Sequence, residues 1–343
     1  MRILLMQKLT AFAALTGAVV VASVYLVSAQ TSSPVLLAAL RASKKSGALA
    51  FIDPASGKIL ARVPTGEDPH GVTADAKMAY VANTTNKGGD SISIIDLAAR
   101  KEVDRVQTGP GSHPHDILVT GGKVYFTAQG YKAVGRYDPV TKTIAWYGIG
   151  QRGPHMLTLS ADGKTLYASN PDSHSVAVID GFAGNDWKLS FITVGGEGEG
   201  IDVSPDGKEV WTADGEDKGG VSIINLASKK VQSVPLQTVH TNRLEISPDG
   251  KYVFVLDRSD NAEVVVVDAA SKKIVKRMRP GVAGAEKVDF DVRDVAMAPD
   301  SSRAFITTRK GTAAYISVID LKTLNMTSKI DLPMGADEMV WVR

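Results

Sequence analysis

Two of the six histidines in this 343-residue chain, His113 and His115, lie one residue apart beside Asp116, in the stretch GSHPHDI. Imidazole and carboxylate groups this close in sequence can ligate a divalent metal or transfer protons. Two further histidines, His70 and His155, follow a proline in the same way. The chemistry open to these side chains depends on whether the fold brings them together.

Internal repeats are the elements that must position them. Units beginning at Leu159, Val203 and Ile246 share a short apolar strand, the turn Asp-Gly-Lys and a β-rich second strand, and Asp-Gly favours tight hairpins. The apolar residue early in each first strand recurs at Val72, Ile117, Leu157, Ile201, Leu244, Val295 and Met339. The residue ending each third strand recurs at Asp53, Asp96, Asp138, Asp180, Asn225, Asp268 and Asp320. Four-stranded units of this length, repeated seven times, predict an all-β, seven-bladed β-propeller.

The two ends of the chain are complementary. Val35–Ala42 and Ala48–Pro64 supply a second, third and fourth strand without a first, whereas Glu338–Arg343 is a first strand alone. We expect the C-terminal strand to join the N-terminal three in one blade. This pairing would close the ring and bury both free sheet edges.

The first strand of each blade should line a central channel. Two residues before each apolar anchor lies a position that we call the first ring: His70, His115, His155, Glu199, Asn242, Arg293 and Asp337. Three histidines on consecutive blades, next to a glutamate, predict a divalent metal site for Zn, Cu, Mn or Fe with ligands His70, His115, His155 and Glu199. A polar small-molecule pocket without metal, or channel lining in which each imidazole bonds a neighbouring blade, are the open alternatives. We expect His113 to lie in a loop.

The opposite half of the ring is ionic. Asn242, Arg243, Arg293 and Asp337 are candidate ligand-binding residues. Arg293 can hold a carboxylate or phosphate as a bidentate fork, or it can pair with Asp337 on the neighbouring blade. Together the two halves describe a funnel at one end of the channel. If the protein is an enzyme, the candidate catalytic residues are His115, His155, Glu199 and Arg293.

The repeats resemble a known family. The segment 78–109, which begins MAYVANTTNKGGDSISIIDL, resembles the YVTN β-propeller repeats of exported and surface-layer proteins, and the resemblance extends over 48–343. It implies a binding or scaffold propeller.

A more distant resemblance concerns an enzyme group. The stretches HPHDILV, GPHMLTLSADGKTLYASN and VRDVAMAPD resemble the inner-strand starts of lactonase-type propellers, the phosphogluconolactonase and carboxymuconate-cyclase group. His115 and Arg293 match that pattern. His155 stands where an arginine is expected, and Arg243 with Glu245 replaces the Glu–Arg strand pattern.

Two functions follow as hypotheses. The first is an exported propeller that binds a small ligand, a divalent metal or both in the funnel, without necessarily being a catalyst. The alternative is a metal-assisted lyase or a lactonase-type hydrolase that acts on an anionic or lactone substrate in the same funnel.

The first 29 residues resemble a secretory signal peptide. Arg2 and Lys8 precede the apolar run Leu9–Val27, and small residues end at Ala29, which is the layout of a cleavable signal. An uncleaved N-terminal anchor is the alternative. The expected mature domain, 30–343, would be periplasmic or secreted, without a membrane span.

Composition limits the partners. Cleavage removes two basic residues and takes the formal charge from +2 to 0, which argues against nucleic acid as a partner because phosphate contacts need clustered Lys and Arg. The chain has no cysteine, which excludes disulfides and thiolate sites. We expect a monomer that binds a small-molecule or protein ligand.

Overall fold

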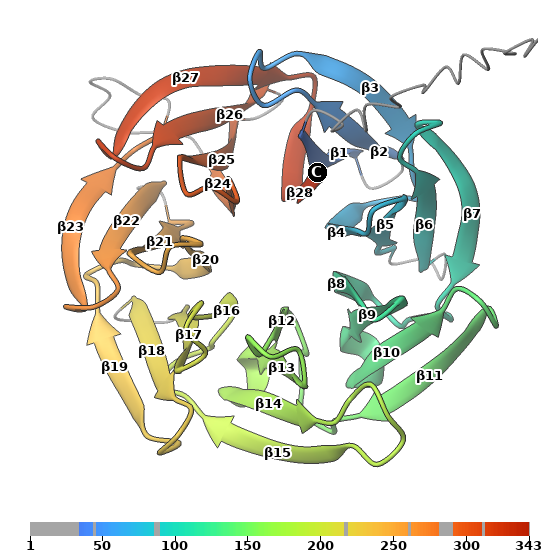
Figure 1. The fold of residues 1–343 in the computed structure, drawn as a ribbon, viewed down its shortest axis with the longest axis horizontal. Coiled ribbons are helices and arrows are strands. Elements are labelled where there is room, and N and C mark those ends of the chain that lie inside the picture. The colour runs from blue at the N-terminus through green and yellow to red at the C-terminus, as the bar shows by residue number, and fades with distance from the viewer. Residues whose placement is uncertain are drawn as a thin grey trace, which may run out of the picture. The chain divides into compact units, whose positions relative to one another are not determined.

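The computed structural model describes residues 34–43, 46–85, 90–215, 219–259, 262–280, 291–310 and 313–342. Within these ranges the strands form seven four-stranded antiparallel sheets arranged in a ring (Figure 1). The predicted seven-bladed propeller is confirmed. The expected signal segment, 1–29, lies outside the described residues.

In each blade the four strands follow one another from the channel to the outer rim. Blade 1 contains β28 (Gly335–Val342), β1 (Val35–Ser43), β2 (Ser46–Ile52) and β3 (Ile59–Pro64). Blade 2 contains β4 (Pro69–Ala74), β5 (Met78–Asn83), β6 (Ser91–Asp96) and β7 (Lys101–Gln107). Blade 3 contains β8 (Pro114–Thr120), β9 (Lys123–Ala128), β10 (Ala133–Asp138) and β11 (Thr143–Gly148). Blade 4 contains β12 (Leu157–Leu159), β13 (Thr165–Asn170), β14 (Ser175–Asp180) and β15 (Lys188–Thr193).

The remaining three blades repeat this order. Blade 5 contains β16 (Ile201–Val203), β17 (Glu209–Asp214), β18 (Gly220–Asn225) and β19 (Val231–Pro235). Blade 6 contains β20 (Thr241–Ile246), β21 (Tyr252–Asp257), β22 (Glu263–Asp268) and β23 (Lys273–Met278). Blade 7 contains β24 (Asp291–Met297), β25 (Arg303–Lys310), β26 (Ala313–Asp320) and β27 (Asn325–Leu332). Two 3₁₀ turns, η1 (Gln129–Tyr131) and η2 (Pro171–Ser173), follow second strands.

The ring closes as expected. Strand β28 pairs antiparallel with β1, so that Val342 lies opposite Val35 and Val340 opposite Leu37. Blade 1 therefore combines both ends of the described chain. The backbone N–H and C=O groups on the facing edges of β1 and β28 pair with each other.

The hydrophobic core lies between blades as well as within them. Strand β22, with four consecutive valines, is buried at all four, because neighbouring blades cover both of its faces. Outer strands such as β7 instead alternate half-buried and exposed residues. Trp211 of blade 5, fully buried, packs in one cluster with Val253 and Val265 of blade 6.

Buried and half-buried carboxylates join the inner strands of neighbouring blades. Each accepts a hydrogen bond from a backbone N–H of the next blade: Asp116 from Leu157 at 2.6 Å, Asp202 from Ile246 at 2.9 Å, Glu245 from Met297 at 3.0 Å and Asp294 from Met339 at 2.8 Å. Inner strands of different blades have no backbone ladder between them, so these side chains satisfy N–H groups that would otherwise be buried and unpaired.

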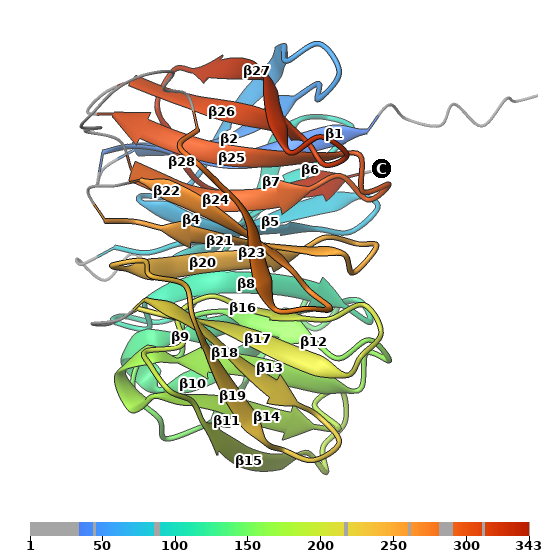
Figure 2. The ribbon, with the colours of Figure 1, turned by 90° about the vertical axis from the view of Figure 1, so that its left-hand side faces the viewer.

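The strands run between the two faces of the ring, as the side view shows (Figure 2). We call the face that holds the first ring the funnel face, and the face that holds the Asp-Gly-Lys turns the turn face. Among the described residues, no helix has the length and apolar character needed to cross a membrane.

Candidate functional site

The first ring lies where the inner strands begin. His70, His115, Asn242, Arg293 and Asp337 belong to β4, β8, β20, β24 and β28, while His155 and Glu199 lie two residues before β12 and β16. None of the seven is exposed. The structure therefore brings the seven first-ring residues to one end of the channel, and the remaining predicted residue, Arg243, follows Asn242 in β20. As expected, His113 lies in the loop before β8, with a left-handed φ of 49°.

The three first-ring histidines form a stack. The ring centroids of His70 and His115 are 4.6 Å apart, and those of His115 and His155 are 3.9 Å apart, with interplanar angles of 37° and 33°. Burial lowers the pKa of His155 to about 4, and the nearby Arg243 and Arg258 charges add to this effect. Burial and the neighbouring histidines lower the pKa of His115 well below its ordinary value. At neutral pH both rings are neutral.

The stack bears directly on the predicted metal site. The imidazoles are stacked with their planes tilted by 37° and 33°, whereas the nitrogen lone pairs of ligands to one ion must point at a common centre. Within the described part of the chain, no three His, Asp or Glu side chains are grouped to hold a metal ion. This arrangement of His70, His115, His155 and Glu199 does not fit a single ion, and metal binding stays a prediction.

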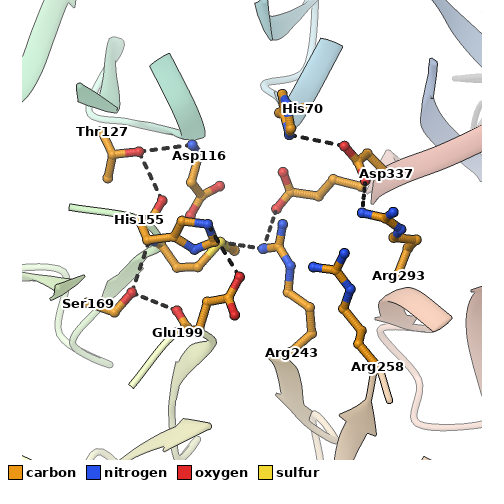
Figure 3. Close-up of polar contacts among 12 residues, drawn as sticks. His70, Asp116, Thr127, His155, Ser169, Glu199, Arg243, Arg258, Arg293 and Asp337 are labelled. Carbon is orange, nitrogen blue, oxygen red and sulfur yellow. Dashed lines mark hydrogen bonds and ion pairs between the residues drawn. The ribbon is translucent and has the colours of Figure 1, made fainter. Parts of the chain in front are cut away.

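Each end of the stack contacts a carboxylate. His70 Nδ1 is 3.0 Å from Asp337 Oδ2, and His155 Nε2 is 3.5 Å from Glu199 Oε1 (Figure 3). Asp337 also accepts a hydrogen bond from Arg41 Nη1 at 3.1 Å. Although burial opposes its ionisation, the His70 hydrogen bond and the charges of Arg293 and Arg41 lower the pKa of Asp337.

Arg243 lies deeper in the channel, among carboxyl groups. It is 7% exposed, its Nη1 is 3.8 Å from Glu338 Oε1, and it contacts the Met156 sulfur. Burial raises the pKa of Asp294 to about 7 and that of Glu338 well above its ordinary value, although Arg243 opposes both shifts. Protons retained on these carboxyls keep the buried charge close to balance around one guanidinium.

Three arginines gather on the other side of the funnel. All three contact the carboxylate of Asp291. Its oxygens lie 2.5 Å from Arg293 Nε, 3.3 Å from Arg258 Nε and 3.6 Å from Arg309 Nη2. Arg293 Nη1 also lies 3.7 Å from Asp337 Oδ1, which is the ion pair considered from the sequence. Burial and the adjacent Arg258 lower the pKa of Arg293. We call Arg258, Arg293 and Arg309 the arginine cluster.

A cleft opens on the funnel face beside the histidine stack. It encloses about 530 Å³ and is lined by polar groups that include His155, Glu199, Gln129, Lys132 and Asp172. Two of the predicted residues, His155 and Glu199, are thus accessible to a small molecule. The buried Nδ1 atoms of His115 and His155 have no hydrogen-bond partner among the described residues.

A second cleft, of about 610 Å³, lies on the turn face between blades 5 and 6. Its charged groups satisfy one another: Lys272 Nζ is 2.5 Å from Glu209 Oε2 and 4.6 Å from the centre of the Trp211 ring. Because the funnel contains buried polar atoms without partners and this cleft shows none among its described lining residues, we place the candidate site in the funnel.

Sequence reasoning missed Arg41, Arg258 and Arg309. The residue before a first-ring position pairs with a residue of the second strand of the same blade, in the pairs Ala336–Leu40, Thr241–Asp257 and Val292–Thr308. Each of the three arginines comes directly after that second-strand residue. This second ring places arginines on blades 6, 7 and 1, whereas the histidines occupy blades 2, 3 and 4. The signal in the sequence is their shared position at the ends of the second strands, which repeats from blade to blade as the first-ring position does.

Solved structures share this architecture. A putative 6-phosphogluconolactonase from Bacteroides fragilis has a TM-score of 0.71 at 16% identity, covering 92% of this chain and 99% of that one. The likeness shows the fold. The periplasmic gluconolactonase of Pseudomonas aeruginosa has a TM-score of 0.69 at 16% identity, with coverages of 90% and 99%. A streptogramin B lyase has 0.61 at 15% identity, with coverages of 77% and 83%.

Sequence comparison adds no family to this result. No protein-family model matches the chain, and no curated protein matches it. The resemblance to YVTN repeats stays a prediction. The propeller fold is common to lactonases, lyases and other proteins, so function has to be argued from the site.

Proposed function

We propose that this propeller binds a small polar molecule in the funnel, in the cleft beside the histidine stack. The observation that carries the proposal is the cleft of about 530 Å³ that opens onto His155 and Glu199. The polar groups of this lining, which include Lys132 and Asp172 beside His155 and Glu199, can exchange hydrogen bonds with a polar ligand.

Binding is better supported than catalysis by the electrostatics of the stack. An effective general base has a pKa near the working pH, whereas burial lowers that of His155 to about 4. A neutral, weakly basic imidazole is well suited to exchange hydrogen bonds with a ligand, and poorly suited to remove a proton from water.

The test is calorimetric titration with sugar acids, lactones, amino acids and nucleotides. We expect one class to bind the wild type, and His155→Gln or Glu199→Gln to weaken binding at least tenfold. His174→Gln is the matched control, because His174 lies in an exposed turn of the same blade. Equal loss in the control, or binding unchanged in both funnel variants, would contradict the proposal.

Lactone hydrolysis is a second candidate function. Two of the similar structures are named lactonases and one a lyase, and His115 and Arg293 match the lactonase-type pattern. In this reaction water adds across the ring ester and opens it to a hydroxy acid. Turnover of a lactone panel by the wild type, lost in His115→Ala and Arg293→Ala, would support it. Turnover that survives both substitutions, or no turnover at all, would exclude it.

Metal binding is tested separately. We propose mass spectrometry of untagged protein after incubation with Zn, Cu, Mn and Fe, compared with a His70/His115/His155 triple alanine variant. One equivalent of metal bound by the wild type and lost in the variant would support the four predicted ligands. Metal-free protein in every case would refute them.

Export is also a proposal. It is supported by the charged and apolar pattern of 1–29 and is consistent with one similar structure being named periplasmic. N-terminal sequencing of the expressed protein tests it: a mature chain that begins at Gln30 indicates cleavage, and an intact N-terminus in the membrane fraction indicates the anchor.

A further inference from the structure

The arginine cluster has more positive charge than its described neighbours balance. Three guanidinium groups approach Asp291, at distances of 2.5, 3.3 and 3.6 Å. The next carboxylate, Asp337, is 3.7 Å from Arg293 and is shared with Arg41 and His70. Among the described residues, the cluster therefore has a local excess of positive charge.

The fold holds these guanidiniums together from two blades. Arg293 and Arg309 lie on paired strands of blade 7, where Arg309 is directly opposite Asp291, and Arg258 follows the second strand of blade 6. Gly335 of blade 1 makes room for one of them, since a Cβ there would lie 2.7 Å from Arg309 Cδ. The fold therefore holds guanidinium groups close together although their positive charges repel one another.

The guanidiniums remain accessible. The side chains of Arg293, Arg258 and Arg309 are 16%, 27% and 34% exposed, so a ligand in the funnel can reach them. Arg293 lies next to Asp337, which also contacts His70 (Figure 3), and the Arg258 charge helps to lower the pKa of His155.

We propose that Arg258, Arg293 and Arg309 form a subsite for a small dianion, either a phosphate group or a pair of carboxylates on one molecule. This inference rests on the proposed function, because it assigns the anionic end of the funnel ligand. Guanidinium forks bind phosphate and carboxylate oxygens in bidentate fashion. A small dianion would offset the positive charge that Asp291 and the more distant Asp337 leave on three guanidinium groups, whereas a neutral ligand would leave the charge excess in place.

The experiment is calorimetry at low ionic strength with inorganic phosphate, malonate and glucose as separate probes. We expect phosphate or malonate to bind. Any binding of glucose should be unchanged by substitutions in the arginine cluster. Arg258→Gln and Arg309→Gln should each weaken dianion binding at least tenfold, and Arg309→Lys should retain part of the affinity because it keeps the charge. Binding should also weaken as salt rises.

The matched control is Arg105→Gln, since Arg105 forms an ion pair with Glu102 on an outer strand far from the funnel. The inference is overturned if neither dianion binds the wild type, if both glutamine variants bind as the wild type does, or if the control loses affinity equally. Which of phosphate and malonate binds more tightly distinguishes the two sources of charge. A panel ligand that binds and depends on His155 but not on Arg258 would uphold the proposed function while refuting this subsite.

Discussion

The histidine stack and the buried carboxyls below it respond to pH in opposite directions. A group with a lowered folded-state pKa stabilises the protein above its unfolded pKa, and one with a raised pKa stabilises it at low pH. His155 belongs to the first kind and Asp294 to the second. Single substitutions can therefore separate two effects that oppose each other in the wild type.

His155→Gln should flatten the acid side of the stability curve. The unfolded chain binds a proton at His155 near pH 6.5, whereas the folded chain does so only near pH 4. This histidine therefore makes the wild type lose stability as pH falls from 6.5 to 4, by about 1.4 kcal/mol per pH unit. Urea unfolding at several pH values should show that the free energy of unfolding of the variant lacks this slope, so that the difference between wild type and variant changes across the window. Parallel curves for the two proteins would contradict the assignment.

Asp294→Asn should produce the opposite trend. Its carboxyl has a folded-state pKa of about 7 against an unfolded value near 3.9, so its contribution to wild-type stability is lost as pH rises from 4 to 7. The amide cannot ionise, and the variant should gain stability relative to the wild type over this window. The same urea series measures it. A constant difference between pH 4 and 7 would show that Asp294 is ionised in the folded protein.

At the scale of the strands, the site depends on how closely neighbouring inner strands approach. Gly71 of β4 is one such point. A Cβ on this residue would lie 2.6 Å from the His115 carbonyl oxygen and 2.9 Å from Asp116 Cα. The glycine therefore lets β8 pack against β4 closely enough for His70 and His115 to stack.

Gly71→Ala should destabilise the propeller by at least about 1–3 kcal/mol, because the clash is with backbone atoms that cannot move independently. Gly148→Ala is the control: this strand residue has nothing within 4 Å of the added atom, and its effect should stay within about 0.5 kcal/mol. Thermal unfolding of both variants provides the comparison. Similar melting temperatures for the two variants would show that the inner strands can separate without cost.

The elements also explain what the sequence could predict. The residues of the first ring can be predicted from the sequence because each lies two residues before an apolar residue of the first strand. This spacing is the same in all seven blades. The arginines of the second ring follow a similar rule from the second strands. By contrast, the tilt of the imidazoles depends on side-chain rotamers and on the approach of β4 to β8, which no repeat spacing encodes. For that reason the sequence indicates which side chains share the first ring but not how their imidazole rings are oriented.

At the scale of the whole molecule, seven blades hold one another in place only if the ring is closed. Each blade covers its neighbours with apolar strands, and side-chain carboxylates link successive inner strands around the channel. Blade 1 is the one blade assembled from both ends of the described chain. The geometry of the funnel, built from every blade, therefore depends on a single strand pairing.

Removal of residues 338–343 should destabilise the protein far more than the loss of six residues suggests. It deletes the pairing of β28 with β1 from Ala38–Met339 to Val35–Val342, removes buried Met339, and uncovers Phe305, which packs on Trp341 at a ring distance of 5.3 Å. Truncating one buried methionine to alanine alone costs about 2–5 kcal/mol. We expect the free energy of unfolding, measured in urea, to fall by at least about 5 kcal/mol, which is comparable to the whole stability of many domains. Aggregation through the exposed edge of β1 should accompany this loss.

A synthetic peptide of residues 335–343 should restore part of the melting temperature by adding the missing strand, whereas a scrambled peptide should not. A truncated protein that unfolds like the wild type would mean that the other six blades hold the ring without this closure.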